Sequence, residues 1–320
     1  IEAGNARVAL PPASLTKLLT ALVAVRALKA HDSVPVSERA EATPARKLNM
    51  KAGEKWPFAD TLHALLLSSA NDAATALGER VAGSLEAFAP VLQSSAERLG
   101  LEDNPVLRDP AGFDDASAVG SGNLVSARDL AIVARAALAE PALASAVALR
   151  EYAFTGPDGA AHRLINHNRL LRLYPGAIGM KTGFTRRAGN TLVAAARRDG
   201  RTLVVVLLGA EDMYGAATAL LDRGFATRAG GANPLGDRLP AIRRLPASSP
   251  LVETAGAGLT FAPEEGNEAA GPSPGLRLGA IAVLGLVGSA CALRIRVLRS
   301  QARRRRARRK AARRNGVART

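Results

Sequence analysis

The chain has 320 residues, of which 48% are hydrophobic and 22% are charged, a balance that excludes wholesale disorder. Its net charge of +15 is unevenly distributed, because residues 294–320 hold 13 Arg or Lys and no acidic residue, which leaves the rest of the chain at only +2. A nearly neutral body excludes a nucleic-acid-binding domain, so we expect no nucleic-acid partner.

The number of cysteines and the spacing of the histidines argue against disulfides and metal sites. Cys291 is the only cysteine, so the chain can form neither an internal disulfide nor a cysteine-based metal site. The histidines are His31, His63, His162 and His167, and none of them has the His-x-x-x-His or His-Glu-x-x-His spacing that metal sites use. We therefore expect no metal.

The first predicted element is a helix that begins near Ser14. Apolar residues recur at spacings of three and four at Leu15, Leu18, Leu19, Leu22, Val25 and Leu28. Ser14 and Lys17 stand three residues apart at its start, so their side chains share one face, beside unpaired backbone N–H groups. A serine hydroxyl needs a base to act as a nucleophile, and a lysine with a lowered pKa can be that base. Alone, however, a Ser-x-x-Lys pair arises often by chance.

A polar sequence interrupts the next apolar pattern. Residues 62–66 and 73–77 have helical spacing, which predicts a helix, a short connection and another helix. Ser69-Ala70-Asn71 falls in that connection, whereas Ser121-Gly122-Asn123 is a competing match in a glycine-rich loop. We favour the first, because a break in a local pattern is expected at a functional site. Either tripeptide could instead be an ordinary turn or helix cap.

The sequence of the second half of the domain predicts one more helix and then strands. Ser126 followed by Asp129 is a capping-box pattern before an apolar helical run. Residues 191–196 and 202–208 are β-rich and flank Arg198-Asp199-Gly200, which predicts a hairpin. A last helix is predicted over about 214–225. Helices first and strands last indicate an α+β fold with helices packed on an antiparallel sheet.

A third polar motif, Lys181-Thr182-Gly183, precedes these strands and is followed by Phe184. On an edge strand it would offer backbone groups to an extended peptide. Lys181 and the Thr182 hydroxyl would bind a substrate carboxylate, and Gly183 would leave room for the substrate backbone. The alternative is an ordinary exposed strand with one surface lysine.

The C-terminal part has a different composition. We predict a globular domain over residues 1–228 and a structureless linker over 229–275, where Gly and Pro make up about a third of the residues. Residues 278–293 carry no charge and are flanked by arginines, so we predict a single transmembrane helix over 276–298. The basic tail, 299–320, would stay in the cytoplasm and the domain would lie outside the cytoplasmic membrane.

The three motifs in this order resemble the penicillin-recognising serine enzymes, whose Ser-x-x-Lys, Ser-x-Asn and Lys-Thr-Gly sequences they match. Their surroundings narrow the resemblance to the D-alanyl-D-alanine carboxypeptidases, which are low-molecular-mass penicillin-binding proteins. The matching stretches include Ser69-Ala70-Asn71-Asp72-Ala73-Ala74 and Gly179-Met180-Lys181-Thr182-Gly183-Phe184-Thr185. The resemblance covers about residues 8–228.

This resemblance implies a penicillin-binding/β-lactamase-like serine hydrolase fold and an acyl-enzyme mechanism. Ser14 would attack the carbonyl between the two terminal D-alanines of a peptidoglycan pentapeptide. Lys17 would take the serine proton, and the nearby ammonium of Lys181 would help to keep Lys17 neutral. β-Lactam antibiotics would acylate the same serine.

The resemblance also implies the remaining roles at the site. Backbone N–H groups of Ser14 and Phe184 would form the oxyanion hole. Ser69 would pass a proton to the leaving D-alanine, and Asn71 would bind the substrate amide. Lys181, Thr182 and Gly183 would complete the substrate site, and no metal or organic cofactor would be needed.

The sequence departs from this family pattern at three points. Only 13 residues precede Ser14, so we expect that sheet strands which normally come before the Ser-x-x-Lys helix are missing. Residues 211–215 offer no arginine for the substrate carboxylate. A separate β-rich domain after the catalytic one is not expected either, because the linker is too short and too rich in Gly and Pro.

Two alternative functions remain open. A β-lactamase would share the motifs, but no convincing Glu-x-x-x-Asn sequence lies between Asn71 and Lys181 to activate a deacylating water. A catalytically weak, membrane-tethered protein that binds peptidoglycan would keep the fold without turnover.

Overall fold

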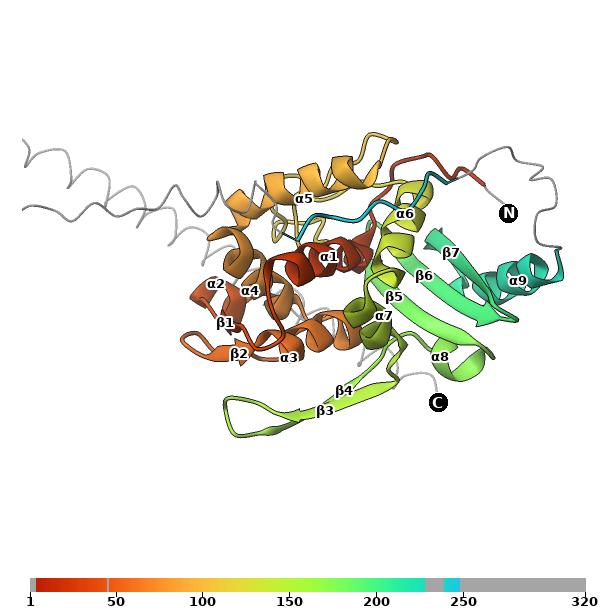
Figure 1. Cartoon of the computed structure of the whole chain (residues 1–320). Coiled ribbons are helices and arrows are strands. Elements are labelled where there is room, and N and C mark those ends of the chain that lie inside the picture. The colour runs from red at the N-terminus through yellow and green to blue at the C-terminus, as the bar shows by residue number, and fades with distance from the viewer. Residues whose placement is uncertain (1–3, 45, 228–238, 248–320) are drawn as a thin grey trace, which may run out of the picture. The chain divides into compact units, whose positions relative to one another are not determined.

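A three-stranded antiparallel sheet lies between two groups of helices (Figure 1). The structure, a computed structural model, describes residues 4–44, 46–227 and 239–247. In spatial order the strands are β5 (Ala177–Thr185), β6 (Gly189–Arg198) and β7 (Arg201–Ala210). One face of the sheet is covered by α9 (Met213–Ala226), and the other by α6 (Ala127–Leu138) and α7 (Pro141–Ala148). The α+β fold with an antiparallel sheet is therefore confirmed.

The middle of the central strand β6, from Leu192 to Ala196, is apolar because it is buried on both faces. Leu192 and Ala194 pack with Leu221 of α9, whereas Val193 and Ala195 belong to the larger helical core. Successive side chains of a strand point to opposite faces, so two cores require a continuous apolar run.

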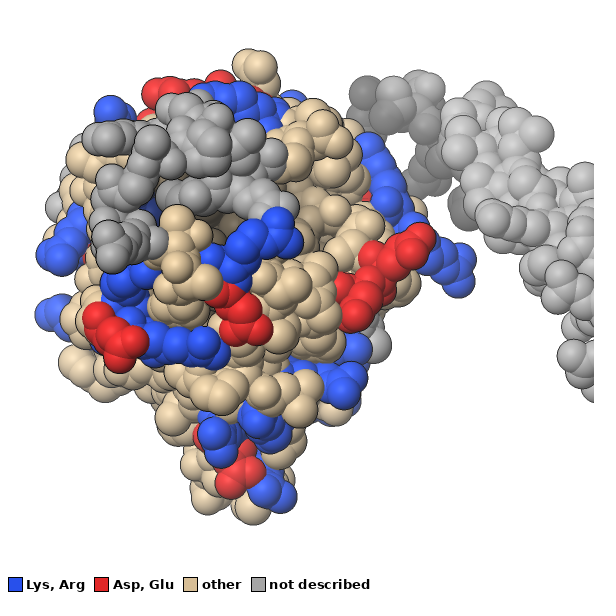
Figure 2. Space-filling view, turned by 90° about the vertical axis from the view of Figure 1, so that its right-hand side faces the viewer, with Lys and Arg blue, Asp and Glu red and all other residues tan. Residues whose placement is uncertain are grey.

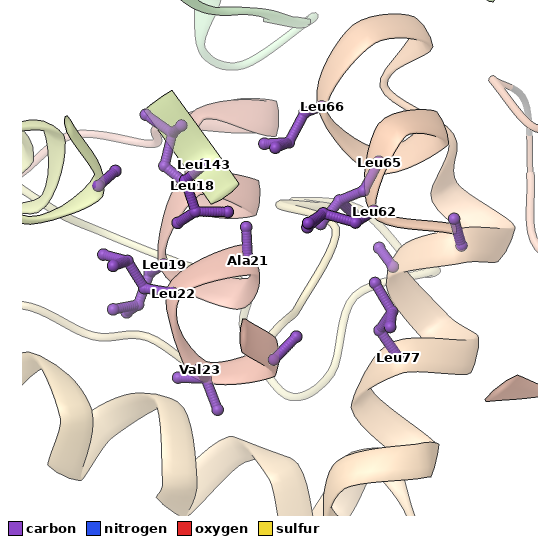
Figure 3. Packing of buried hydrophobic residues seen from close by; sticks show 14 of the residues in the cluster. Leu18, Leu19, Ala21, Leu22, Val23, Leu62, Leu65, Leu66, Leu77 and Leu143 are labelled. Atoms are coloured by element: carbon purple, nitrogen blue, oxygen red, sulfur yellow. The ribbon is translucent and has the colours of Figure 1, made fainter. Parts of the chain in front are cut away.

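The larger core is centred on α1 (Lys17–Ala27), which contacts α4 (Asn71–Ala82) and α5 (Leu85–Leu99). Figure 3 shows its leucines among those of the neighbouring helices. The fully or nearly fully buried side chains in that view include Leu18, Leu19, Leu22, Leu62, Leu65, Leu66, Leu77 and Leu143. The predicted apolar stripe thus lies in the core, as expected for a helix that packs on several sides.

Two predicted helix boundaries differ in detail. Ala13–Thr16 form a 3₁₀ turn, η1, and the α-helix begins only at Lys17. The predicted helix, connection and helix are α3 (Phe58–His63) with its π-helical continuation η2 (Ala64–Ser68), then Ser69 and Ala70, then α4. Ser69 has left-handed backbone angles, φ 61° and ψ 33°, which end the right-handed helix at this residue.

Ser126 caps α6 as predicted, since its Oγ accepts a hydrogen bond of 3.0 Å from the backbone N–H of Asp129. The reciprocal half of the capping box is absent. Instead, the Asp129 carboxylate accepts the N–H groups of Glu102 and Asp103, and so ties the loop after α5 to α6. Two short helices complete the described part, α2 (Glu38–Ala42) and α8 (Leu170–Leu173).

The predicted β6–β7 hairpin is confirmed, with Arg198 opposite Arg201 across the turn. Two further antiparallel pairs are absent from the sequence-based prediction. They are β1 (Ser33–Pro35) with β2 (Lys55–Pro57), and β3 (Glu151–Thr155) with β4 (Ala161–Ile165). Most residues of these strands are exposed or half-buried, so their apolar alternation is too weak to indicate strands.

Residues 239–247, which belong to the predicted linker over 229–275, contain no helix or strand but pack against the domain. Leu245 is buried in the larger core, Leu239 packs against it, and Arg135 of α6 donates to the Pro240 carbonyl at 2.8 Å. The high Gly and Pro content of the whole stretch hides these two leucines. Most of the predicted linker, the transmembrane helix over 276–298 and the tail over 299–320 lie outside the described residues.

Within the described ranges, no single helix is long and apolar enough to cross a membrane. Only α6 and α7 together reach the required length and composition, and they are bent by 103°. Figure 2 shows one face of the molecule, on which Lys and Arg side chains are interspersed with Asp and Glu. This mixed surface agrees with the nearly neutral charge of the chain before residue 294.

Candidate active site

The start of the first helix brings Ser14 and Lys17 into contact. Their Oγ and Nζ atoms are 3.0 Å apart, as one helical turn allows. Ser14 is half-buried and so remains accessible, whereas Lys17 is completely buried. A reachable hydroxyl beside a buried amine is the arrangement that an activated serine nucleophile needs.

Two further partners fix the Lys17 amine. Nζ donates to Asn71 Oδ1 and to the Ala111 carbonyl, each at 2.7 Å. A neutral amine has two N–H donors and one lone pair. With both donors used by these oxygens, the lone pair is left for the Ser14 O–H, so the contacts suit a base that takes the serine proton.

Burial lowers the pKa of Lys17 to about 7, while the carboxylates of Asp109 and Asp72 oppose the shift and Arg46 adds to it. A large fraction of the amine is therefore neutral at neutral pH. The sequence-based interpretation gave Lys181 the task of keeping Lys17 neutral. The structure attributes the shift mainly to burial, and the cation that adds to it is Arg46.

The carbonyl that holds Lys17 belongs to a loop folded around Asp109. One carboxylate oxygen, Oδ1, accepts the backbone N–H groups of residues 111–113 at 2.6–3.0 Å. Gly112 has a φ of +84°, and a Cβ there would lie 1.9 Å from the Ala13 carbonyl oxygen. This close approach requires glycine and packs the loop directly against η1.

Asn123, from the competing Ser121-Gly122-Asn123 match, holds the same loop by hydrogen bonds. Its Oδ1 accepts the N–H groups of Arg108 and Asp109 at 2.8 and 2.9 Å, and its Nδ2 donates to Thr16 Oγ1 at 3.0 Å. Asn123 makes no hydrogen bond to Lys17. Of the two Ser-x-Asn sequences, the structure therefore brings the first, with Asn71, to the lysine.

Asn71 is more tightly engaged than the resemblance implied. Besides accepting from Lys17, its amide donates to the Pro44 carbonyl at 3.1 Å, so Asn71 is fixed at the lysine in the free protein. Its binding of a substrate amide stays a prediction. Ser69 is buried nearby, but its hydroxyl makes no hydrogen bond to any described residue. The expected proton relay through Ser69 has no preformed link to Lys17.

The site has a helical wall, which carries Ser14, Lys17 and Asn71, and a second wall formed by β5, which passes beside Ser14. A Cβ at Gly183 would lie 2.9 Å from the Ser14 backbone nitrogen and 2.5 Å from Thr191 Oγ1. The same threonine donates to the Pro12 carbonyl at 3.0 Å and so anchors the residues before Ser14 to β6. Gly183 thus makes room for the chain's own backbone at Ser14, and the room expected for the substrate backbone stays a prediction.

Lys181 is completely buried on β5, and its Nζ donates to the Thr182 carbonyl at 2.8 Å. Burial, followed by the charges of Lys17 and Arg46, holds the pKa of Lys181 well below its usual range. Burial and these charges therefore disfavour the protonated form of the Lys181 amine. The Thr182 side chain makes no hydrogen bond to a described residue, and the Phe184 side chain is 64% exposed.

Two residues that the sequence analysis did not select lie at the same site. Arg46 Nη1 lies 2.8 Å from His167 Nδ1, although 121 residues separate them. Burial lowers the pKa of His167 to about 4, with Arg46 and Lys181 adding to the shift. The ring is therefore neutral, and Nδ1 accepts because arginine can only donate. Among the described residues no three His, Cys, Asp or Glu side chains gather as a metal site.

These walls and motifs match a known family. A family profile described as D-alanyl-D-alanine carboxypeptidase, Peptidase S11, matches residues 1–212. The chain belongs to this family. Among its curated members, DacB2 of Mycobacterium tuberculosis is 34% identical over 225 residues, which cover 68% of this chain and 75% of DacB2. DacF of Bacillus subtilis is 30% identical over 230 residues, which cover 69% of this chain.

Solved structures in and near this carboxypeptidase family have the same fold. The D-alanyl-D-alanine carboxypeptidase from Mycobacterium tuberculosis superposes with a TM-score of 0.67 at 32% identity, over 72% of this chain and 87% of that one. A point mutant of the Streptomyces K15 DD-transpeptidase gives 0.63 at 26% identity, over 71% and 92%. The chain spans only 58% of the length of DacF and 52% of DacC from Escherichia coli.

Proposed function

We propose that this protein is a serine-type D-alanyl-D-alanine carboxypeptidase that acts on peptidoglycan stem peptides. The observation that carries the proposal is the continuous contact from Ser14 through Lys17 to Asn71, with the lysine buried and its pKa near 7. Membership of the carboxypeptidase family supports the choice of substrate.

The proposed reaction has two steps. Lys17 accepts the Ser14 proton while Oγ bonds to the carbonyl carbon between the two terminal D-alanines. The C–N bond then breaks, and the terminal D-alanine leaves with a proton on its amine. Water hydrolyses the resulting ester on Ser14, which releases the shortened peptide and restores the hydroxyl. The N–H groups of Ser14 and Phe184 are proposed to bind the oxyanion.

DD-Transpeptidation is the second candidate, because the Streptomyces K15 enzyme with that activity shares the fold. It uses the same acyl-enzyme but transfers the peptide to an amine instead of water. The intact contact between Ser14 and Lys17 favours either reaction over a binding protein without turnover. A β-lactamase would differ from both by rapid hydrolysis of penicillin.

The test is D-alanine release from a peptide that ends in D-alanyl-D-alanine, with and without an added amine acceptor. We expect release without the acceptor, and loss of release in Ser14→Ala. Release only with the acceptor would replace the carboxypeptidase by a transpeptidase. Penicillin acylation without release in either condition would indicate a binding protein, and rapid penicillin turnover a β-lactamase.

We also propose that residues 276–298 anchor the protein in the cytoplasmic membrane, with the catalytic domain outside and the basic tail inside. The support is the uncharged run over 278–293, its flanking arginines and the 13 basic residues that follow. In intact spheroplasts, external protease should spare the tail and remove the domain. Cleavage of the tail from outside would contradict the orientation.

A further inference from the structure

We propose that Arg46, held in place by His167, binds the terminal carboxylate of the peptide that Ser14 attacks. The inference rests on the proposed function and assigns a residue to its substrate-binding step. A peptide that ends in a free carboxylate calls for a positive group next to the scissile bond, and arginine matches a carboxylate with two parallel N–H donors.

The corner after the last strand offers no such cation. Glu211 and Asp212 follow β7, and the Asp212 carboxylate accepts the Gly215 N–H at 3.0 Å to cap α9. These two residues provide no positive group for an incoming carboxylate.

Arg46 is the cation that the other side of the site supplies. Its carbonyl accepts the N–H of Asn71, the residue that holds Lys17, so Arg46 lies next to the Ser-x-Asn segment of the site, and its charge also acts on Lys17 and Lys181. Burial lowers the pKa of both lysines, whereas a guanidinium keeps its charge. Arg46 is therefore a permanent positive charge near both of them.

The donors of Arg46 are also largely unused. Its side chain is exposed, and its hydrogen bond to His167 leaves the other N–H groups of the fork open. Within the described residues, no carboxylate pairs with it. An arginine beside two buried amines, without an acidic partner, provides a place for an anion that the protein itself does not fill.

The backbone of Arg46 is held by the Ser-x-Asn segment. The Asn71 N–H donates to the Arg46 carbonyl at 2.7 Å. The neighbouring Asp72 carboxylate accepts the N–H groups of residues 48–50 at 2.8–3.2 Å, so it fixes the chain just after Arg46. The residue that holds Lys17 and the residue that follows it therefore also position the proposed carboxylate-binding arginine.

His167 is likewise fixed before substrate binds. Its N–H donates to the Leu67 carbonyl of η2 at 3.2 Å, and Asn166 beside it donates to the carbonyls of Val147 and Leu149. His167 is a positioning residue, since it contacts Arg46 and not the reacting atoms. A fixed acceptor reduces the side-chain entropy that Arg46 would otherwise lose on binding.

The test compares two donors with the full-length protein, one peptide ending in D-alanyl-D-alanine and the same peptide with a terminal carboxamide. We expect the wild type to prefer the free acid, and Arg46→Gln to reduce that preference about tenfold to a hundredfold, as for loss of hydrogen bonds to a charged group. The loss should appear mainly in KM for the free acid. Lys47→Gln is the matched control, because Lys47 is next in sequence and donates to the Glu41 carbonyl instead.

A second readout keeps the proposal testable if no D-alanine is released. The acylation rate of Ser14 by benzylpenicillin, which carries a carboxylate, is compared with that by its methyl ester. Arg46→Gln should slow the acid and spare the ester. Absence of D-alanine release by the wild type would overturn the proposed function alone, and the penicillin pair would still decide the role of Arg46.

Two results would overturn the inference. One is an Arg46→Gln variant that slows acid and ester, or acid and amide, equally. The other is a loss that follows a carboxylate on the side chain of the third stem residue and ignores the terminal one. For His167, we expect the His167→Ala variant to have a lower preference for the free acid than the wild type. The His167→Gln variant keeps a hydrogen-bond acceptor and should restore part of that preference. Equal preferences in the two variants would show that His167 does not position Arg46.

Discussion

The two buried motif lysines lie in regions that provide opposite surroundings. Lys17, on the helical wall, has three hydrogen-bond partners and lies within range of the carboxylates of Asp109 and Asp72. Lys181, on β5, has one backbone carbonyl as partner, and the charges that act on it are those of Lys17 and Arg46. Burial is the main cause of a lowered pKa for both, so burial alone does not decide which lysine is the base.

The difference indicates separate tasks. The carboxylates near Lys17 keep its pKa close to neutrality, which allows the amine to gain and lose a proton during the reaction. The pKa of Lys181 is lowered by burial and by nearby positive charge, so an incoming anion would stabilise its protonated form. The helical wall is therefore suited to proton transfer, and the β5 wall to binding a negative group.

Replacement of each lysine by arginine should have the largest effect on acylation. Lys17→Arg keeps a positive charge but cannot act as a base, so acylation by a labelled penicillin should fall about 10²- to 10⁴-fold. Lys181→Arg should lose less, because the base and Ser14 remain. The measurement is the rate of acyl-enzyme formation in both variants, and equal losses would show that the two lysines do not have separate tasks.

The pH dependence of acylation should report Lys17 directly. Its pKa lies near 7 in the folded protein, so the amine is protonated and inactive below that pH and neutral above it. The acylation rate should therefore rise with pH and level off above about 7, with a difference of about 100-fold between pH 5 and the plateau. A flat profile from pH 5 to 8, or a midpoint near the ordinary lysine value, would argue against Lys17 as the base.

Gly183→Ala tests how closely the two walls meet. The new Cβ would lie 2.9 Å from the Ser14 nitrogen and 2.5 Å from Thr191 Oγ1, so β5 and η1 must separate. We expect acylation to fall about tenfold or more. Gly4→Ala is the control, since no atom lies within 4 Å of a Cβ there. Unchanged acylation in Gly183→Ala would mean that the walls move apart without cost.

The smallest expected effect is a pair of opposite shifts in the midpoint of the pH profile of the acylation rate. Asp109 raises the pKa of Lys17 and Arg46 lowers it. Asp109→Asn should therefore move the midpoint below 7, and Arg46→Gln should move it above 7, each by less than about one pH unit. Thermal unfolding of both variants checks that the fold is retained. Shifts in the same direction would contradict the assigned charges.

Local sequence patterns predicted the elements that carry the nucleophile. The apolar spacing from Leu15 to Leu28 indicated the helix, and the three-residue step from Ser14 to Lys17 indicated their contact, because both depend only on helix geometry. The turn between β6 and β7 was likewise readable from Asp199 and Gly200. The resemblance supplied the family, which the profile match confirmed.

What the sequence did not predict depends on contacts between distant parts of the chain. Arg46 meets His167 across 121 residues, and β5 approaches Ser14 at Gly183, so neither follows from local spacing. His167 was considered only for metal-binding patterns, although the asparagines on both sides of it indicated a structured polar turn. Leu245 was missed because Gly and Pro dominate the composition around it.

The proposed reaction depends most on Ser14 as the nucleophile that Lys17 activates. The most direct measurement is peptide mapping by mass spectrometry of the full-length protein after reaction with benzylpenicillin. We predict one penicilloyl group on the peptide that contains Ser14, and none anywhere in Ser14→Ala. An adduct on Ser69, or an adduct that persists in Ser14→Ala, would contradict the account.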